Sequence, residues 1–415
     1  MLASSRSDAP NVDFPLCRDP RHEAVIRRAV VRACDLLRER LPEGKLAALI
    51  LTGSFARGEG SVMAARGRLR VLGDIEFLVV LASAVDYYAY RTQVAAWGKE
   101  ATEAVRHDVE VDVEFGPVGI EYLRRYAQPS IFVYDLIRHG KVVWGPPDII
   151  ELVRDFGPEH IPPADALYLL FNRTIEQLEA WDRVPTLEGR ALWDLAYQRL
   201  KLMLDLAGSA LAFSGRHEPS YEARPGAFAR LLAETPSLAA ALPATFVPDL
   251  ERAARLKIAP GDGSGVLADE LTIEAQRAWI RSRMATAVPA VTALLRWELA
   301  ALLETDGDIP ALLRRWLATA GFRRRVWDWA KLAMNPRPSP VPLSRLRGAR
   351  LFLTSTPRGL LYAAAALAYL NLERPTIPPR RIAALLPVRR SALRHRPDAE
   401  RGVITALWRW CVRNT

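Results

Sequence analysis

The sequence predicts an α+β protein in which a small mixed sheet comes first and helices follow. Two observations support this prediction. Apolar runs of strand length, punctuated by charged or glycine-containing turns, fall between residues 45 and 119. From about residue 160 onward, nearly every segment has apolar residues at helical spacing. We therefore expect an N-terminal sheet domain with helices on one side, then a helical bundle, then a further helical C-terminal region.

The predicted elements of the first domain alternate between the helical spacing and the strand spacing of apolar residues. "RHEAVIRRAVVRACDLLRERL" has apolar residues on one helical face, "KLAALILTG" is a buried strand, and "VEVDVEFGPV" alternates acid and apolar residues as a half-buried strand does. In chain order we expect a helix (21–41), strands (45–53 and 70–82), a helix (85–106), a strand (109–118), and a helix that ends at Gly140 before a short strand.

Domain boundaries are expected where proline, glycine and acidic residues gather. We expect a loose arm at residues 1–20, the sheet domain at 21–155, a helical bundle at 160–305 and a basic helical region at 309–415. Pro289 should kink the last helix of the bundle, since proline cannot donate a backbone hydrogen bond.

No stretch predicts a membrane span. "GLLYAAAALAYLNL" is shorter than the roughly 20 apolar residues that a span needs, so we expect a buried helix there. The start of the chain has no apolar segment of signal-peptide length, which favours a cytoplasmic protein. The three cysteines lie far apart in sequence and suggest neither a disulfide framework nor a metal site.

The positive charge of the chain belongs to its last third. Residues 301–415 contain 20 Arg and one Lys against seven acids, a net charge of +14, whereas residues 1–300 carry about −4. This region could bind an anionic polymer, and "FRRRVWDWAK" and "LWRWCVRN" interleave Arg with Trp as nucleic-acid-binding surfaces do. Two alternatives remain open. Arginine outnumbers lysine 51 to 6, which a GC-rich genome alone produces, and core helices with inward Trp and outward Arg show the same pattern.

Carboxylates gather on two predicted strands. Asp74 and Glu76 are two residues apart and share a face, and Glu110, Asp112 and Glu114 share a face in the same way. Such acids on neighbouring strands repel one another unless cations lie between them, and hard oxygen ligands favour Mg²⁺. A solvated sheet face is the alternative. The "LTGSFARGEGS" turn after the first strand favours a functional site, because its backbone N–H groups can hold phosphate.

These residues resemble a known family. Gly53-Ser54 with Ala56-Arg57-Gly58 is similar to the phosphate turn of the polymerase β-type nucleotidyltransferase superfamily, "DIE" at 74–76 to its paired carboxylates, and Asp112 to its third carboxylate. "YDLIRHGKVVWGP" is similar to the segment that closes this domain in bacterial members. The segment between Ser54 and Asp74 is longer than is usual in the family. The later helices are similar, more weakly, to the bundle of aminoglycoside nucleotidyltransferases.

The resemblance implies a role for each site residue. Gly53 and Ser54 would bind the phosphates of a nucleoside triphosphate, while Asp74, Glu76 and Asp112 would hold two Mg²⁺ ions, or Mn²⁺, and Asp112 would accept a proton from the acceptor.

Two basic residues are further candidates for nucleotide contacts. Arg57 is a candidate phosphate contact, with an ordinary exposed arginine as the alternative. Lys201 would face the triphosphate; its alternative is an ion pair with Asp205, four residues further along a helix.

A loop and the histidines complete the sequence-based expectations. The loop "GRHEPSYEARPG" could close over a substrate, with His217 as an ordinary loop residue. The six histidines show no metal-ligand spacing, so no zinc site is predicted.

Three functions remain open. The first is transfer of a nucleoside monophosphate to a hydroxyl or similar group of a small molecule, with release of pyrophosphate, and we favour it. The second is the same transfer to RNA or protein. The third is a non-catalytic nucleotide-binding or regulatory module, such as a sensor or an antitoxin-like partner.

Overall fold

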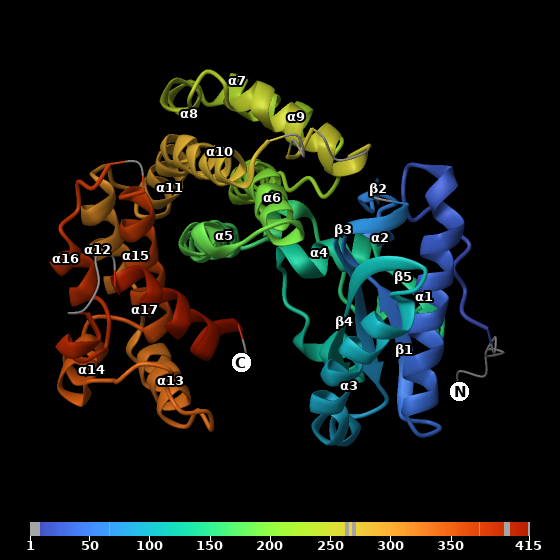
Figure 1. Ribbon diagram of the computed structural model, residues 1–415. Coiled ribbons are helices and arrows are strands. Elements are labelled where there is room, and N and C mark those ends of the chain that lie inside the picture. Colours follow the sequence, from blue (N-terminus) through green and yellow to red (C-terminus); the bar gives the residue numbers. More distant parts are fainter. Residues whose placement is uncertain are drawn as a thin grey trace. The chain divides into compact units, whose positions relative to one another are not determined.

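The computed structural model describes residues 9–65, 67–261, 265–267, 271–372, 374–393 and 399–413. In this part the chain is mixed α+β, with a five-stranded sheet near the N-terminus and seventeen α-helices (Figure 1). It divides into two compact units. Unit 1 comprises residues 1–165, 214–227 and 250–269, and unit 2 comprises residues 166–213, 228–249 and 270–415.

The sheet of unit 1 is mixed, as expected. Its strands are β1 (Leu46–Leu51), β2 (Val62–Ala65), β3 (Arg68–Leu81), β4 (Val109–Gly119) and β5 (Lys141–Trp144). The long strand β3 is antiparallel to β1 and β2 and parallel to β4, and β1 is antiparallel to β5. Helix α3 (Ala84–Val105) is the crossover that a parallel β3–β4 pair requires.

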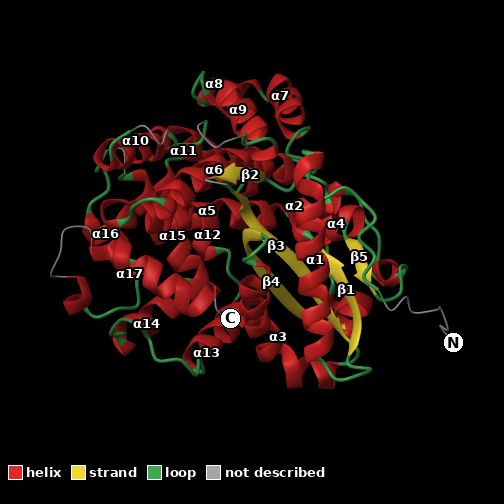
Figure 2. Cartoon of the chain, turned by 45° about the vertical axis from the view of Figure 1, so that its right-hand side comes forward, coloured by secondary structure: helices red, strands yellow, loops and turns green. Residues whose placement is uncertain are grey.

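Apolar residues cover both faces of the sheet. On one face, α1 (Pro20–Arg40) and α3 pack against alternate residues of β1, β3 and β4 (Figure 2). On the other face, α4 (Ile131–His139) and two short helical turns (Tyr122–Tyr126 and Ile149–Leu152) pack against Ala48, Ile50, Leu78 and Val80. The expectation of helices on one side is therefore corrected. The end of β3 is apolar at every position, so both of its faces must be buried.

The segment before α1 also differs from expectation. Val12 and Leu16 are buried in the core of unit 1. The Leu16 N–H donates to the Glu23 carboxylate (3.1 Å), and the Gly60 N–H donates to the Leu16 carbonyl (3.0 Å). Residues 9–19 thus pack on the domain rather than form a loose arm, because their apolar side chains have a core to enter; residues 1–8 lie outside the described part.

The helices that follow the sheet domain agree with the predicted helical period. They are α5 (Pro163–Arg183), α6 (Arg190–Phe213), α7 (Arg224–Glu234), α8 (Pro236–Ala241), α9 (Phe246–Ile258), α10 (Ile273–Thr286), α11 (Val288–Leu302), α12 (Ile309–Ala318), α13 (Phe322–Ala333), α14 (Arg345–Phe352), α15 (Pro357–Leu370), α16 (Pro379–Ala384) and α17 (Ala399–Trp408). Residues 309–415 group with the preceding helices of unit 2, whereas 214–227 and 250–269 group with the sheet.

Two helical predictions can be compared directly with the structure. Helix α15 is buried along almost its whole length, as expected for a core helix. Pro289 was expected to kink one long helix, but the chain forms α10 and α11 with a break at Ala287, because a proline fits best in the first turn of a new helix. Residues 273–302 are long and apolar enough to qualify as a membrane span by length and composition alone, which is weak evidence, and half of their most apolar 18-residue window is buried.

Candidate functional site

The turn after β1 lies directly against β3. Thr52 is extended, and its N–H and hydroxyl both donate to the Glu76 carbonyl, at 2.9 and 3.2 Å. Gly53 follows with φ +68°, a left-handed conformation that favours glycine. A Cβ atom on Gly53 would lie 2.8 Å from Oε2 of Glu76. The Gly53-Ser54 turn and the Glu76 carboxylate are therefore immediate neighbours, and only glycine leaves both backbone and carboxylate in place.

Strands β3 and β4 bring two pairs of carboxylates together in register. Asp74 is paired with Asp112, and Glu76 with Glu114. Neighbouring strands lie about 4.8 Å apart, so the side chains of each pair leave the sheet side by side. The residues between them, such as Ile75 and Val113, point into the core of unit 1 and fix which face the acids occupy.

The acids on this face of the sheet differ in the role that the sequence predicted for them and in the groups that surround them. The role of Glu114 was not expected from the sequence beyond its place on the acidic face. Glu110, on the same face, lies 3.8 Å from Nε of Arg70 and belongs to a separate ion pair. Asp74 is half-buried and Asp112 exposed, and in the described part of the chain no hydrogen bond or ion pair joins either side chain to another residue.

The donor set suits a hard divalent cation in type, because all of its members are carboxylates on two adjacent strands. The described residues nevertheless contain no group of three or more His, Cys, Asp or Glu side chains placed to hold a metal ion. Asp74, Glu76 and Asp112 are therefore brought to one face of the sheet without forming a complete coordination shell.

The long segment between Ser54 and Asp74 forms a β-hairpin. Strand β2 pairs with the start of β3 from Val62 opposite Val71 to Ala65 opposite Arg68. A register shift lies between Arg70 and Asp74, and Gly73 there has φ +130°. The extra residues thus lengthen β3 at its N-terminal end, and the bulge sets the direction of Asp74.

Arg57 is enclosed by protein groups. Its side chain is 7% exposed, with Nε 3.3 Å from Glu59 and Nη1 3.2 Å from Asp135 of α4. Its guanidinium also lies 5.0 Å from the ring centre of Tyr221. Neither sequence-based interpretation of Arg57, a phosphate contact or an exposed arginine, describes this environment. The side chain joins the end of the Gly53-Ser54 turn to α4 and to the 214–227 segment of unit 1.

Glu59 binds the 214–227 segment. Its carboxylate accepts hydrogen bonds from the Ser220 hydroxyl (2.6 Å) and from the backbone N–H of Tyr221 (3.0 Å). Burial raises the pKa of Glu59, but these hydrogen bonds and the charge of Arg57 outweigh it, so that the pKa lies below its ordinary value. Glu59 is thus held as a carboxylate.

Asp135 holds the same segment at a second point. Oδ1 of Asp135 lies 2.8 Å from Nε2 of His217, whose side chain is only 3% exposed. Burial raises the pKa of Asp135. The hydrogen bond from His217 and the charges of His217 and Arg57 lower it by more, so the pKa lies below its ordinary value. The loop that could close over a substrate is packed on unit 1 through His217 and Tyr221.

Tyr221 is surrounded by cations. Besides Arg57, Arg224 lies 4.8 Å and Lys257 5.3 Å from its ring centre. Tyr221 and Arg224 belong to the loop "GRHEPSYEARPG" that the sequence singles out, whereas no periodicity marks Glu59, Asp135 or Lys257. The contacts of Tyr221 with Arg57 and Glu59 join residues more than 160 positions apart in the chain, so only the fold brings them together.

Lys201 lies in α6 of unit 2 and is half-buried. Asp205, its expected partner in the alternative interpretation, has its carboxylate 2.7 Å from Nε of Arg173 on α5. The role of Lys201 therefore stays a prediction.

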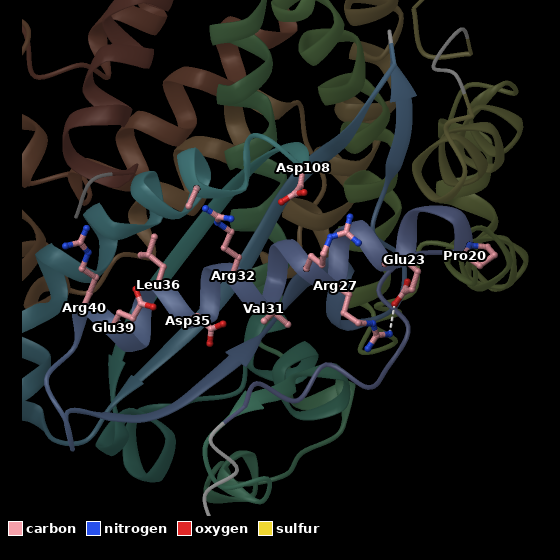
Figure 3. Close-up of a pocket in the computed structure, with 13 residues that line it drawn as sticks. Pro20, Glu23, Arg27, Val31, Arg32, Asp35, Leu36, Glu39, Arg40 and Asp108 are labelled. Carbon is pink, nitrogen blue, oxygen red and sulfur yellow. Dashed lines mark hydrogen bonds and ion pairs between the residues drawn. The ribbon is translucent and has the colours of Figure 1, made fainter.

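A separate groove follows the outer face of α1. Its lining mixes acidic, basic and apolar residues, among them Arg27, which is 3.0 Å from Glu23, and it includes Asp108 just before β4 (Figure 3). None of the predicted site residues lines it.

Comparisons with family models, with curated proteins and with solved structures give no match to this chain.

Proposed function

We propose that this protein is a metal-dependent nucleotidyltransferase that moves a nucleoside monophosphate from a nucleoside triphosphate to a hydroxyl or similar acceptor. The observation that carries the proposal is the position of the Gly53-Ser54 turn beside Glu76, on the strand that also presents Asp74 next to Asp112. A glycine-containing turn of the kind that can present N–H groups to phosphate thus lies beside carboxylates of the kind that can hold Mg²⁺, which supports the proposal. This combination is also what the resemblance to polymerase β-type nucleotidyltransferases implies.

The proposed step is an in-line displacement. The acceptor oxygen forms a bond to the α-phosphorus while the bond from that phosphorus to the bridging oxygen breaks, so pyrophosphate leaves and the acceptor's proton passes to Asp112 or to water. Asp74, Glu76 and Asp112 would hold Mg²⁺, two ions in all, which neutralise charge on the attacking and leaving oxygens when bound. Gly53 and Ser54 would present backbone N–H groups and a hydroxyl to the β- and γ-phosphates.

Arg57 has a positioning role in this proposal. Because its guanidinium is committed to Glu59 and Asp135, it holds the end of the phosphate turn against α4 rather than reaching a phosphate itself. Lys201 remains the proposed basic residue of the helical unit for the triphosphate. The favoured acceptor is a small molecule in the cytoplasm, with RNA or protein as the alternative.

The test is transfer of label from triphosphates labelled at the α-phosphate. Each of the four nucleoside triphosphates is incubated with the protein, Mg²⁺ and cell extract, and products are separated into small molecules, nuclease-sensitive material and protease-sensitive material. We expect one fraction to become labelled with equimolar pyrophosphate release. Asp74→Asn should abolish the transfer.

The matched control is Asp108→Asn, which removes an exposed carboxylate just before β4 and should leave transfer unchanged. Circular dichroism confirms that both variants are folded. Full activity of the Asp74→Asn protein would refute the assignment. Binding of Mg²⁺-nucleotide without transfer to any fraction would favour the non-catalytic module instead.

A further inference from the structure

The first two helices after α12 form an exposed surface that is both apolar and basic. Helices α13 and α14 contain no buried residue. Of the thirteen strongly exposed large apolar side chains in the described chain, six lie between residues 322 and 353, with 43–71% of their surface exposed. They are Phe322, Val326, Trp327, Met334, Leu346 and Leu353. Scattered exposed apolar residues are ordinary, but a cluster of this kind marks an interaction surface.

These side chains fall on connected faces of the two helices. Trp327 and Met334 are seven residues apart on α13 and its end, and Leu346 and Leu353 are seven apart on α14, so each pair lies along one side of its helix. The rings of Phe322 and Phe352 lie 6.1 Å apart, which brings the two helices into contact. The exposed apolar residues thus lie on two helices that contact each other.

The helices are attached to unit 2 by other residues. The Trp329 indole N–H donates to the Ser355 carbonyl (2.9 Å). The Arg347 guanidinium donates to the carbonyls of Val388 and Ala383, at 3.1 and 3.0 Å. Because these inward contacts anchor the helices, the outward apolar residues are not required to hold them in place.

The surface is strongly cationic. Residues 322–353 contain seven Arg and one Lys against a single acid, Asp328, a net charge of +7. Arg323, Lys331 and Arg350 are exposed, and Nζ of Lys331 lies 5.4 Å from the ring of Trp327. A partner must therefore present negative charge to the cations and, right beside it, an apolar region that accepts the apolar side chains.

We propose that α13 and α14 form a peripheral docking surface for an anionic lipid bilayer. The four aliphatic side chains decide between the two anionic partners. Single-stranded nucleic acid stacks on aromatic rings and would leave Val326, Met334, Leu346 and Leu353 in water. The interfacial layer of a bilayer accepts aromatic and aliphatic side chains alike, while Arg and Lys bind its anionic headgroups. This inference concerns unit 2 and is independent of the proposed nucleotidyl transfer.

The test is sedimentation of the full-length protein with vesicles. We expect binding to vesicles of mixed phosphatidylcholine and phosphatidylglycerol, little binding to phosphatidylcholine alone, and a loss of binding as salt rises. Trp327→Ser should weaken binding about tenfold, since the free energy gained by burying a large apolar side chain in the bilayer is then lost. Arg350→Glu should weaken it by at least about fivefold, the effect of one basic residue near an anionic surface.

Two matched controls test whether any exposed residue has the same effect. Val85→Ser on α3 removes an equally exposed apolar side chain, and Arg28→Glu on α1 reverses an exposed charge; neither should change vesicle binding. Absence of binding to anionic vesicles overturns the proposal. It is also overturned if single-stranded RNA binds instead and Trp327→Ser weakens that binding.

Discussion

Glu298 of α11 provides a quantitative test of the helical unit. Its side chain is completely buried, and Oε1 lies 2.6 Å from Oγ of Ser209 on α6. The same Oγ lies 2.9 Å from the carbonyl of Ala166 on α5. The serine hydroxyl has one proton and cannot donate to both oxygens. Both hydrogen bonds form if the Glu298 carboxyl is protonated and donates to the Ser209 hydroxyl, which in turn donates to the Ala166 carbonyl. A neutral acid thereby links three helices.

The expected magnitude follows from the pKa. Burial raises the pKa of Glu298 from 4.5 to about 8, against a smaller opposing effect of the Ser209 hydrogen bond. Between these values the folded protein keeps a proton that the unfolded chain has released, so stability is full below pH 4.5 and is lost as pH rises toward 8. The loss is about 1.4 kcal/mol for each pH unit, or roughly 3 kcal/mol between pH 5 and 7.5.

The perturbation is Glu298→Gln, which keeps a hydrogen-bonding group of the same size without a titrating proton. Urea unfolding is measured at intervals between pH 5 and 7.5. We expect the variant to lose the pH dependence and to be more stable than the parent at pH 7.5. Five of the six histidines, the side chains that ordinarily titrate in this range, belong to unit 1 rather than to the unit that contains Glu298.

The control is Glu274→Gln on α10, whose carboxylate is 82% exposed. This variant should keep the pH dependence of the parent. If Glu298→Gln unfolds with the same pH dependence as the parent, the proton does not lie on Glu298 and the assignment of a neutral acid is refuted.

Three further predictions concern unit 1. Gly53→Ala should lower the unfolding free energy by about 1–2 kcal/mol, because of its positive φ, and should weaken binding of Mg²⁺-ATP in a calorimetric titration by displacing the Glu76 carboxylate. Glu59→Gln should destabilise unit 1 at pH 7 by about 1–3 kcal/mol, since buried hydrogen bonds lose their charged acceptor. Because the pKa of Glu59 is lowered in the folded state, the parent should lose that stability as pH falls below 4.5, and the variant should lose less on acid titration. Asp112→Asn should raise the thermal unfolding temperature in the absence of Mg²⁺, since it removes repulsion from Asp74; an unchanged or lower temperature would contradict the paired arrangement.

The sequence was most informative where a structural feature depends on local periodicity. The alternation in "VEVDVEF" places Asp112 on one face of β4, and the spacing of Asp74 and Glu76 does the same on β3, whatever the rest of the fold. The amphipathic segment between them predicts the helix α3, which is long enough for the crossover that a parallel pair requires, and the structure shows that β3 and β4 are parallel neighbours. The coincidence of Asp74 with Asp112 then depended only on register.

Contacts between segments that are far apart in the chain leave no periodic pattern in the sequence. Glu59 meets Ser220 and Tyr221 across about 160 residues, and Ser61 and Lys257 meet across 196. Each contact consists of one or two polar groups in a loop, where neither helical nor strand period applies. For this reason the sequence-based domain boundaries assign residues 214–227 to the helical bundle, while the structure groups them with the sheet.

Trp side chains in the basic third show why composition alone left two alternatives open. Trp408 and Trp410 are buried, as in ordinary core helices, whereas Trp327 is 60% exposed. The two Arg–Trp segments look alike in sequence, because helical period shows which residues share a face but not which face is covered. That information comes from the neighbouring elements, and on α13 it is Trp329 rather than Trp327 that faces them.

Strand β3 explains why the repulsion at the acidic face persists in the fold. Asp74, Glu76, Leu78 and Val80 lie on the same face, but the last two are covered by α4 and its flanking turns while the first two carry charge. Core packing on both faces of the apolar end fixes β3, and ten paired positions hold β4 beside it. Because the packing fixes the two strands, the backbones of the paired acids stay side by side, and we expect their repulsion to be relieved by a bound cation or by substitution. This is why Asp112→Asn should stabilise the protein only while Mg²⁺ is absent, and why added Mg²⁺ should raise the unfolding temperature of the parent but not of the variant.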